Sequence, residues 1–432
     1  MGLFESLRRL PPIIAIAASA LLAACAPRPE SAPPAAAAVQ EQRAPVTILI
    51  SIDGFRADYL QRGLTPTLSR LAADGVSASM IPSFPSKTFP NHWTLVTGYV
   101  PDHHGITANA FNDPARPEAK DRFTMAVTDP FFWNAKEPLW VSAEKAGIRS
   151  AAMFWPGSAV AWGGTLKPRG YGRSDGGTRP ADWQAFDQNV SPIQRVNAII
   201  DWLRRPAAIR PRLLFLYFDE VDTAGHDSGP DGKDVPDALA DVDRDVAALL
   251  DGLAALGQPA NLVIVADHGM AETRGSRTIA LDKLLSPEDY VLDEAGPYAT
   301  FIPKPGRKDA LEAKLLRPHP HMQCWRKAQI PARFDYGTNP RIPPYLCLAE
   351  TGWQILATMP EEHRTGGNHG YDNMAPEMRA LFIASGPAFR RGITLPDFPN
   401  TAIAPLMRRV IGLPQDPAMD GTLAPVDAAL AH

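Results

Sequence analysis

The chain has 432 residues, of which 45% are hydrophobic and 21% are charged, and its formal net charge is −4. This composition is typical of a soluble globular protein that is large enough for one big α/β domain or two smaller ones. The small net charge argues against a dedicated nucleic-acid binder, which normally carries a strong basic excess, and we expect no stable nucleic-acid binding.

The first 25 residues have the pattern of an export signal rather than of folded structure. Two arginines precede a short apolar stretch, residues 13–24, which ends in small residues and is too short for a membrane span. The segment that ends at Cys25 resembles the bacterial lipobox, in which the cysteine is lipidated; a plain signal peptide is the alternative. We expect a lipoprotein signal over residues 1–25 and a flexible tether over 26–45. The protein would then be exported and held at the periplasmic face of a bacterial membrane, or be free in the periplasm.

Cys324 and Cys347 are the remaining cysteines. In an exported protein, two such thiols more often form a disulfide than a metal site, because no third or fourth cysteine exists to complete a structural zinc cage. We expect a disulfide that stabilises the fold by about 3 kcal/mol in the chain-entropy picture.

Apolar strands and amphipathic helices alternate along the chain. Continuous apolar runs predict strands at 46–52, 150–155, 213–218, 261–266 and 381–384, and helical spacing predicts helices at 64–73, 196–203 and 238–256. This alternation favours an α/β fold with a mainly parallel sheet flanked by helices, in which ligands bind beyond the carboxyl ends of the strands. Residues from about 276 to 350 break the rhythm, and we interpret them as a small inserted subdomain with a short sheet, within a catalytic domain that spans 46–432.

Acidic and histidine side chains lie where the predicted strands end. Asp53 and the pair Asp267-His268 directly follow strands, and Asp222 and His226 are four residues apart, which lets one helical turn direct both at a single ion. Mixed nitrogen and oxygen ligands without thiolate suit zinc, although manganese or iron could occupy such a site. Each residue alone has an ordinary explanation, since an aspartate at a strand end usually caps a helix. Their number on one expected face predicts a metal centre, to which His369 offers a further imidazole.

Thr88 lies in the stretch 84–93, around which we expect the site to be organised. A threonine before Phe-Pro is most often a helix N-cap, and that structural role is the alternative. A threonine hydroxyl is almost never ionised near neutrality, so a role as nucleophile requires a cation beside it.

Six segments, in chain order, resemble the signature set of the nucleotide pyrophosphatase/phosphodiesterases of the alkaline phosphatase superfamily, in their bacterial form. They are residues 51–56, 87–92, 104–109, 222–226, 266–270 and 369–374. The resemblance runs from about residue 46 to 410 and implies an alkaline phosphatase-like α/β fold. It also implies an enzyme that hydrolyses nucleotide phosphodiester and phosphoanhydride bonds and releases nucleoside 5′-monophosphates through a phospho-threonine intermediate.

The resemblance further implies two Zn²⁺ ions and assigns a role to each site residue. Asp53, Thr88, Asp267 and His268 match the ligands of one zinc, with Thr88 as the nucleophile, and Asp222, His226 and His369 match the ligands of the second. Asn109, with the backbone N–H of Phe89, matches the groups that hold a non-bridging phosphate oxygen.

The substrate pocket is predicted from aromatic residues. Phe89 and Phe186 could sandwich a base, and Trp155 matches a further pocket element; core packing is the alternative for these rings. A small-molecule nucleotide is the expected substrate of a monomeric enzyme, and lysophospholipid or glycerophosphodiester head groups are the alternative for the same site. A non-catalytic surface protein would be marked by loss of Thr88 or of a metal ligand, and neither is lost.

Overall fold

A computed structural model of the chain describes residues 41–118, 121–167, 173–361 and 365–431. The predicted signal segment, Cys25 and residues 26–40 of the predicted tether lie outside the described residues. Within them, no helix has both the length and the apolar character needed to cross a membrane. Residues 43–432 form one compact unit, which is the unit described below.

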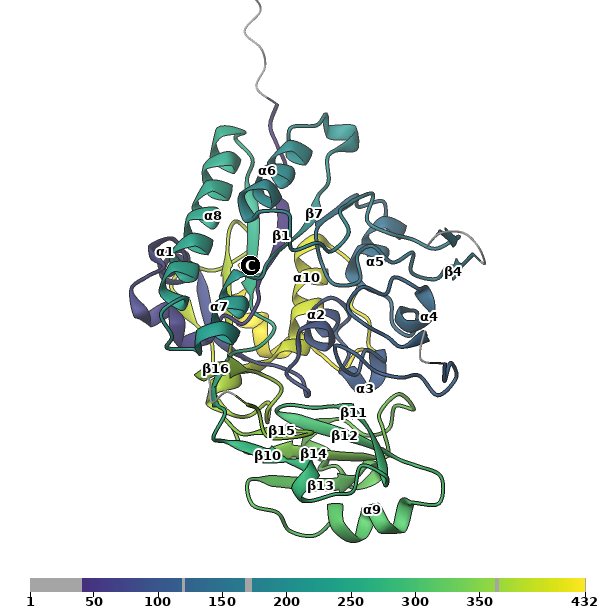
Figure 1. The fold of residues 1–432 in the computed structure, drawn as a ribbon. Coiled ribbons are helices and arrows are strands. Elements are labelled where there is room, and N and C mark those ends of the chain that lie inside the picture. Colours follow the sequence, from purple (N-terminus) through teal and green to yellow (C-terminus); the bar gives the residue numbers. More distant parts are fainter. Residues whose placement is uncertain (1–40, 119–120, 168–172, 362–364, 432) are drawn as a thin grey trace, which may run out of the picture. The chain divides into compact units, whose positions relative to one another are not determined.

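A nine-stranded sheet lies at the centre of this unit (Figure 1). In sheet order its strands are β18 (Ile393–Thr394), β2 (Val76–Ile81), β17 (Ala380–Ser385), β8 (Ala260–Val265), β1 (Val46–Ile52), β7 (Leu213–Phe218), β3 (Ser150–Met153) and β6 (Asp182–Trp183), and β19 (Phe398–Pro399) also pairs with β2. Every pair is parallel except those that β17 forms with β2 and β8. The residues of β1 and β7 are all buried, as expected for strands covered on both faces. The predicted mainly parallel α/β sheet is therefore confirmed.

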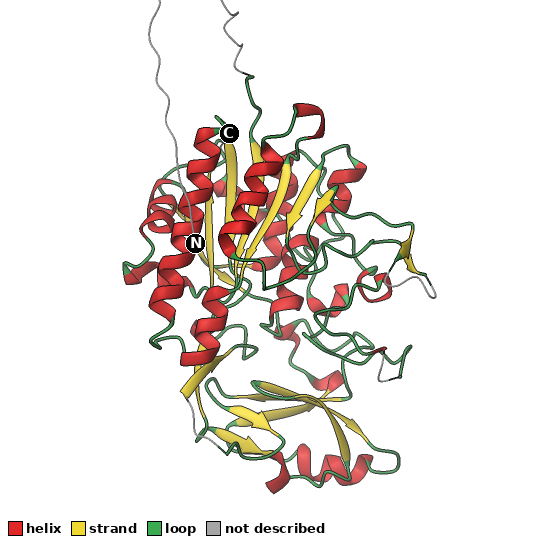
Figure 2. Cartoon of the chain, turned by 45° about the horizontal axis from the view of Figure 1, so that its top comes forward, coloured by secondary structure: helices red, strands yellow, loops and turns green. Residues whose placement is uncertain are grey.

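Helices cover both faces of this sheet (Figure 2). The longer ones are α1 (Pro66–Asp74), α2 (Thr88–Thr97), α5 (Leu139–Lys145), α6 (Pro192–Leu203), α7 (Glu220–Ser228), α8 (Val235–Ala255) and α10 (Ile403–Ile411), and α3 (Pro101–His104) and α4 (Pro130–Trp133) are single turns. The connections through α1, α6 and α8 all run in one direction across the sheet, and the connection through α2 and α5 runs in the other. Because such crossovers are right-handed, the two groups lie on opposite faces.

A second, antiparallel sheet carries the order β11-β12-β14-β13. Its strands are β11 (Tyr290–Glu294), β12 (Tyr298–Pro303), β14 (Tyr345–Ala349) and β13 (Met322–Arg326), and α9 (Lys308–Leu315) packs on it. Two short strand pairs flank this sheet in the sequence: β10 (Thr278–Ala280) pairs with β15 (Gln354–Leu356), and β9 (Ala271–Arg274) pairs with β16 (Thr365–Asn368). Elsewhere in the chain, β4 (Thr165–Leu166) and β5 (Ser174–Asp175) form a separate short hairpin. β9 and β16 pair with each other and lie outside residues 276–350. The inserted region therefore extends beyond the range expected from the sequence.

The predicted disulfide between Cys324 and Cys347 is present. The two cysteines lie directly opposite each other in the β13–β14 pair. Cys347 is fully buried in the core of the second sheet, so the bond ties an outer strand to that core.

Asp102 and Arg341 fasten the segment after β13 to the body that carries the central sheet. The Asp102 carboxylate accepts the backbone N–H groups of Gly337, Thr338 and Asn339 at 2.9–3.0 Å. The Arg341 guanidinium donates to Asp113 at 2.6 Å and to the carbonyl oxygens of Gly105 and Phe132 at 2.8 and 2.7 Å.

Replacing Asp102 by alanine is expected to lower the free energy of unfolding by about 1.5–3 kcal/mol, because three backbone N–H groups lose a charged acceptor. Asp231→Ala is the matched control, since the Asp231 side chain is 79% exposed in its pair with Arg62 and such pairs contribute little. Urea unfolding of both variants measures the difference. Equal losses in the two variants would show that Asp102 does not fasten the segment.

Candidate metal centre and active site

Most of the predicted ligands come from the carboxyl ends of neighbouring strands of the central sheet. Asp53 directly follows β1, Asp267 and His268 follow β8, Asp222 and His226 lie in α7 just after β7, and His369 follows β16. β8, β1 and β7 are adjacent and parallel, so their carboxyl ends meet at one edge of the sheet. Thr88 is the first residue of α2 and lies at the same edge, because β2 ends there shortly before it.

One group of side chains meets around the imidazole of His268. Its Nε2 lies 2.9 Å from Oδ2 of Asp267 and 3.4 Å from Oδ1 of Asp53. The Thr88 hydroxyl oxygen lies 3.4 Å from the same nitrogen. The four residues predicted for the first ion are therefore together.

A second group forms around His226. Its Nε2 lies 3.4 Å from Oδ2 of Asp222 and 3.2 Å from Nε2 of His369. The ring of His369 stacks on that of His268 with centroids 3.5 Å apart, so the two groups adjoin. The three residues predicted for the second ion are also together.

In both groups, oxygen and nitrogen atoms with free lone pairs face the cluster and can bind cations. Asp53 Oδ1, Asp222 Oδ1 and Asp267 Oδ2 are buried and have no hydrogen-bond donor. The Nδ1 atoms of His226, His268 and His369 lie 2.8, 2.9 and 2.8 Å from the carbonyl oxygens of Gly367, Gly269 and Ser86. A ring that donates from Nδ1 presents its Nε2 lone pair to the cluster, which is the usual arrangement of metal-binding histidines. These residues fit one or two divalent cations that prefer nitrogen and oxygen ligands.

The electrostatics of the cluster lead to the same conclusion. Burial, with the charges of Asp267 and Asp222, raises the pKa of Asp53 well above its ordinary value. Burial also raises the pKa of Asp267, and burial with the nearby His268 lowers that of His369. Buried carboxylates at such close range repel one another unless positive charge lies between them.

His92 lies beside Asp53 and Asp267 but is not available as a ligand. Its Nδ1 donates to the carbonyl oxygen of Thr88 at 2.8 Å, and its Nε2 accepts the Ser51 hydroxyl at 2.8 Å. Both ring nitrogens are therefore occupied, and burial lowers the pKa of His92 to about 3, which keeps the ring neutral. His92 was not among the predicted site residues, although its position one helical turn after Thr88 was a signal that could have found it.

Lys87 is a second residue beside the cluster that was not among the predicted site residues. It is 8% exposed beside the second group, and its Nζ lies 3.4 Å from Oδ1 of Asn368. Gly370 makes room for it, because a Cβ there would lie 2.6 Å from Cε of Lys87. Burial lowers the pKa of Lys87, with the charges of Glu294 and Asp222 opposing that shift.

Asn109 lies beside the start of α2. Its side-chain oxygen accepts the backbone N–H of Phe89 at 2.9 Å. Both groups therefore lie next to Thr88, where the amino end of a helix favours negative charge.

The aromatic residues predicted for the pocket occupy different environments. The rings of Phe89 and Phe186 touch edge to face, with centroids 5.7 Å apart and 73° between planes, so no slot lies between them. Stacking of a base between these rings stays a prediction, and it requires the more exposed Phe186 to move. Trp155 is 1% exposed and donates from Nε1 to the carbonyl oxygen of His92 at 3.2 Å. Trp155 therefore packs against α2 and is too deeply buried to contact a ligand.

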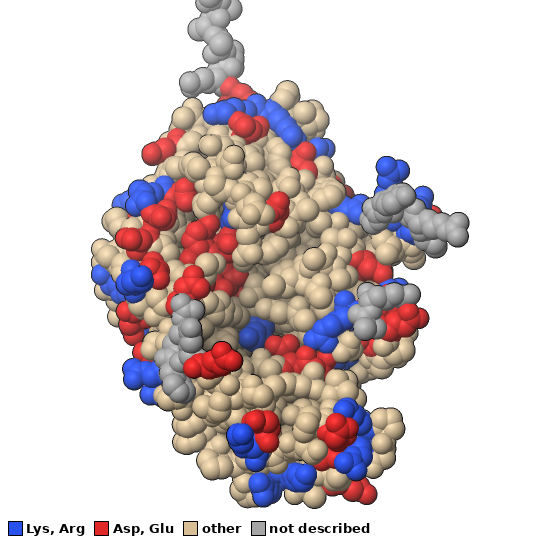
Figure 3. Space-filling model, in the orientation of Figure 1, with Lys and Arg blue, Asp and Glu red and all other residues tan. Residues whose placement is uncertain are grey.

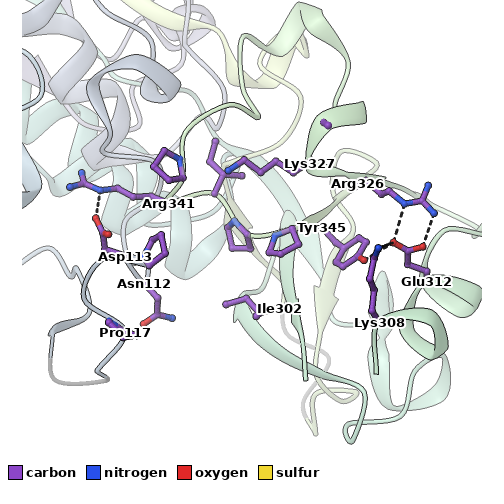
Figure 4. Close-up of a pocket in the computed structure, with 16 residues that line it drawn as sticks. Asn112, Asp113, Pro117, Ile302, Lys308, Glu312, Arg326, Lys327, Arg341 and Tyr345 are labelled. Carbon is purple, nitrogen blue, oxygen red and sulfur yellow. Dashed lines mark hydrogen bonds and ion pairs between the residues drawn. The ribbon is translucent and has the colours of Figure 1, made fainter. Parts of the chain in front are cut away.

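A large cavity is drawn in Figure 4. Its volume is about 790 Å³, and its lining comes from residues 112–114 and 117, from the second sheet with α9, and from the segment 340–345. Four of its charged residues form two pairs, Arg341 with Asp113 at 2.6 Å and Arg326 with Glu312 at 2.7 Å. None of the predicted site residues lines it, so cavity size does not locate the chemistry. Acidic side chains instead gather over α7 beside a hollow in the surface (Figure 3).

The fold and the cluster together define a class of protein. A mainly parallel sheet carries carboxylates and imidazoles at one edge, beside a hydroxyl at a helix start, as metal-dependent hydrolases of the alkaline phosphatase type do. Residues 47–372 match the family described as type I phosphodiesterase / nucleotide pyrophosphatase. The chain belongs to this family of the alkaline phosphatase superfamily, and it is an enzyme of that class.

Individual relatives span most of the chain. An uncharacterized pyrophosphatase/phosphodiesterase of Schizosaccharomyces pombe is 36% identical over 388 residues, which cover 86% of this chain and 77% of the relative. The bis(5′-adenosyl)-triphosphatase enpp4 of Xenopus laevis is 36% identical, over 90% of this chain and 82% of the relative. The structure of human ectonucleotide pyrophosphatase/phosphodiesterase 5 superposes with a TM-score of 0.82 at 32% identity, over 90% of this chain and 100% of that one.

Proposed function

We propose that this chain is a two-zinc phosphodiesterase that cleaves nucleotide phosphodiester and phosphoanhydride bonds and releases nucleoside 5′-monophosphates. The observation that carries the proposal is the position of the Thr88 hydroxyl. Its oxygen lies 3.4 Å from His268 Nε2, within a cluster where three buried carboxylate oxygens have no donor. Asp53, Asp267 and His268 would hold one ion with Thr88, and Asp222, His226 and His369 would hold the other.

The reaction proceeds in two displacements at phosphorus. The Thr88 hydroxyl gives up its proton to solvent and its oxygen forms a bond to phosphorus while the bond to the leaving oxygen breaks. The leaving group departs with that electron pair and takes up a proton from solvent where its oxygen is basic enough. Water then displaces the Thr88 oxygen from the phospho-threonine and releases the monophosphate. Bound zinc supplies the positive charge that lowers the pKa of the attacking hydroxyl and stabilises the leaving oxygen.

Asn109 and the N–H of Phe89 would hold a non-bridging phosphate oxygen during both steps. The Phe89 N–H, which donates to the Asn109 side-chain oxygen at 2.9 Å, would donate to the phosphate oxygen instead, and Asn109 would donate from its side-chain NH₂ group. Donors already in place for developing charge are the largest single source of stabilisation in many active sites.

Two relatives support a nucleotide substrate. A murine ectonucleotide pyrophosphatase/phosphodiesterase 5, described as an inactive threonine-to-alanine variant in complex with AMP, is 33% identical and superposes with a TM-score of 0.82. The Xenopus relative is named a bis(5′-adenosyl)-triphosphatase. Purified protein is expected to cleave the nitrophenyl ester of thymidine 5′-monophosphate faster than nitrophenyl phosphocholine. A strong preference for the choline ester would overturn the nucleotide assignment in favour of lipid head groups.

Phe186→Ala is expected to weaken binding of the nucleotide ester by about 1–3 kcal/mol, the usual contribution of one stacked base. This corresponds to a rise in KM of roughly 5-fold to 150-fold. Nitrophenyl phosphocholine is the matched control, because it has no base and should show an unchanged KM. An equal rise for both substrates would mean that Phe186 supports the site without contacting a base.

We also propose that the chain is exported and anchored through a lipid on Cys25. Cys25→Ala is expected to move the protein from the membrane fraction to the soluble fraction of its host, because the anchor would be absent. Recovery of the variant in the membrane fraction would contradict a lipid anchor.

A further inference from the structure

The carboxylate of Asp53 is oriented by one side chain, that of Tyr217. The Tyr217 hydroxyl donates to Oδ2 of Asp53 at 2.6 Å. Oδ1 has no donor, and it is the oxygen that lies 3.4 Å from Nε2 of His268. The hydrogen bond therefore decides which oxygen of Asp53 faces the cluster.

Tyr217 is itself held firmly in place. It lies in β7, directly opposite Ser51 of β1, and it is 2% exposed. The rings of His92 and Phe186 pack against it with centroids 5.2 and 5.3 Å away. A ring enclosed in this way cannot turn its hydroxyl from Asp53 without disturbing the strand or its neighbours.

The partner carboxylate is held in another way. Oδ1 of Asp267 accepts the backbone N–H of Gly54 at 3.3 Å, and its Oδ2 is the oxygen without a donor. Asp267 thus depends on the main chain, which no side-chain substitution removes. The orientation of Asp53 depends on the Tyr217 hydroxyl, and a substitution of Tyr217 can test this dependence.

We propose that Tyr217 is a positioning residue that sets the affinity of the Thr88-side metal site by fixing Asp53. This proposal rests on the proposed function, because it requires a cation that binds at Asp53. Residues that orient metal ligands in this way typically change metal affinity by about 10-fold to 100-fold when they are removed.

Tyr217→Phe keeps the ring and removes only the hydroxyl. Metal-free full-length protein is titrated with zinc against a chromophoric chelator, which reports the affinity of each equivalent. We expect one of two equivalents to bind about 10-fold to 100-fold more weakly, and the other, at Asp222, His226 and His369, to be unchanged. Cobalt substituted for zinc should show altered absorption bands for one of its two ions.

Tyr298→Phe is the matched control. Tyr298 is 1% exposed in the second sheet, and its hydroxyl has no hydrogen-bond partner. Removing that hydroxyl should leave both zinc affinities unchanged. Excess zinc should restore the kcat of Tyr217→Phe, with half-saturation shifted by the same factor as the weakened equivalent; a merely structural defect would not be rescued by metal.

Unchanged affinity for both equivalents in Tyr217→Phe would overturn the proposal, and so would equal weakening of both. As a second test, Asp53→Asn is compared with Asp53→Asn/Tyr217→Phe. The second substitution should then cost no further zinc affinity, because the two residues act as one unit, and a further loss would contradict the proposal. Wild-type protein that binds two zinc ions but does not cleave nucleotide esters would refute the proposed function and leave the Tyr217 result standing.

Discussion

Thr88→Ala is expected to lower turnover of the nucleotide ester by roughly a thousandfold or more, because removal of a nucleophile removes the covalent route. Zinc binding should survive in part, since Asp53, Asp267 and His268 remain. Steady-state assays together with measured zinc content test both expectations.

Thr97→Ala is the matched control for this experiment. Thr97 is a fully buried threonine at the other end of α2, where its hydroxyl donates to the carbonyl oxygen of Trp93 at 2.6 Å. This variant should keep turnover near that of the parent. Comparable turnover in Thr88→Ala would show that water attacks the substrate directly.

Removal of metal by a chelator is expected to abolish turnover and to destabilise the fold, and added zinc should reverse both effects. A cation present at 100 times its dissociation constant stabilises the native state by about 2.7 kcal/mol. Thermal unfolding with and without chelator measures the change. Turnover that persists in chelator, with no zinc left in the protein, would refute a metal-dependent mechanism.

The metal-free protein should also have an unusual dependence on pH. The pKa values of Asp53 and Asp267 are raised in the folded protein by burial and by neighbouring carboxylates. The folded state then holds protons that the unfolded state has released, so stability falls as pH rises from about 4 toward the raised folded-state pKa. Zinc should remove this dependence, because it stabilises the ionised carboxylates.

Strand ends were predictable from the sequence because buried parallel strands are continuous apolar runs. The runs before Asp53 and Asp267 fixed both positions, and the shared edge of a parallel sheet then brought the residues together. The direction of β17 was not predictable, since an apolar run carries no sign of direction, and β17 is antiparallel to both neighbours.

Helix starts and tertiary partners were less predictable. The predicted helix at 196–203 begins at Pro192, because Ser191 and Gln194 form a capping box whose spacing was readable but not used. The roles of His92 and Tyr217 depend on partners 41 and 164 residues away, Ser51 and Asp53. No local sequence pattern encodes such contacts. The burial of Trp155 against α2 likewise depends on a residue that is distant in the sequence, His92.

The most direct measurement is anomalous X-ray scattering at the zinc edge from crystals grown with zinc. Two peaks are expected, one within bonding reach of Asp53, Asp267, His268 and Thr88 and the other within reach of Asp222, His226 and His369. Absence of anomalous density at both groups in zinc-saturated crystals would contradict the two-ion site, and with it the role of Thr88 as the nucleophile.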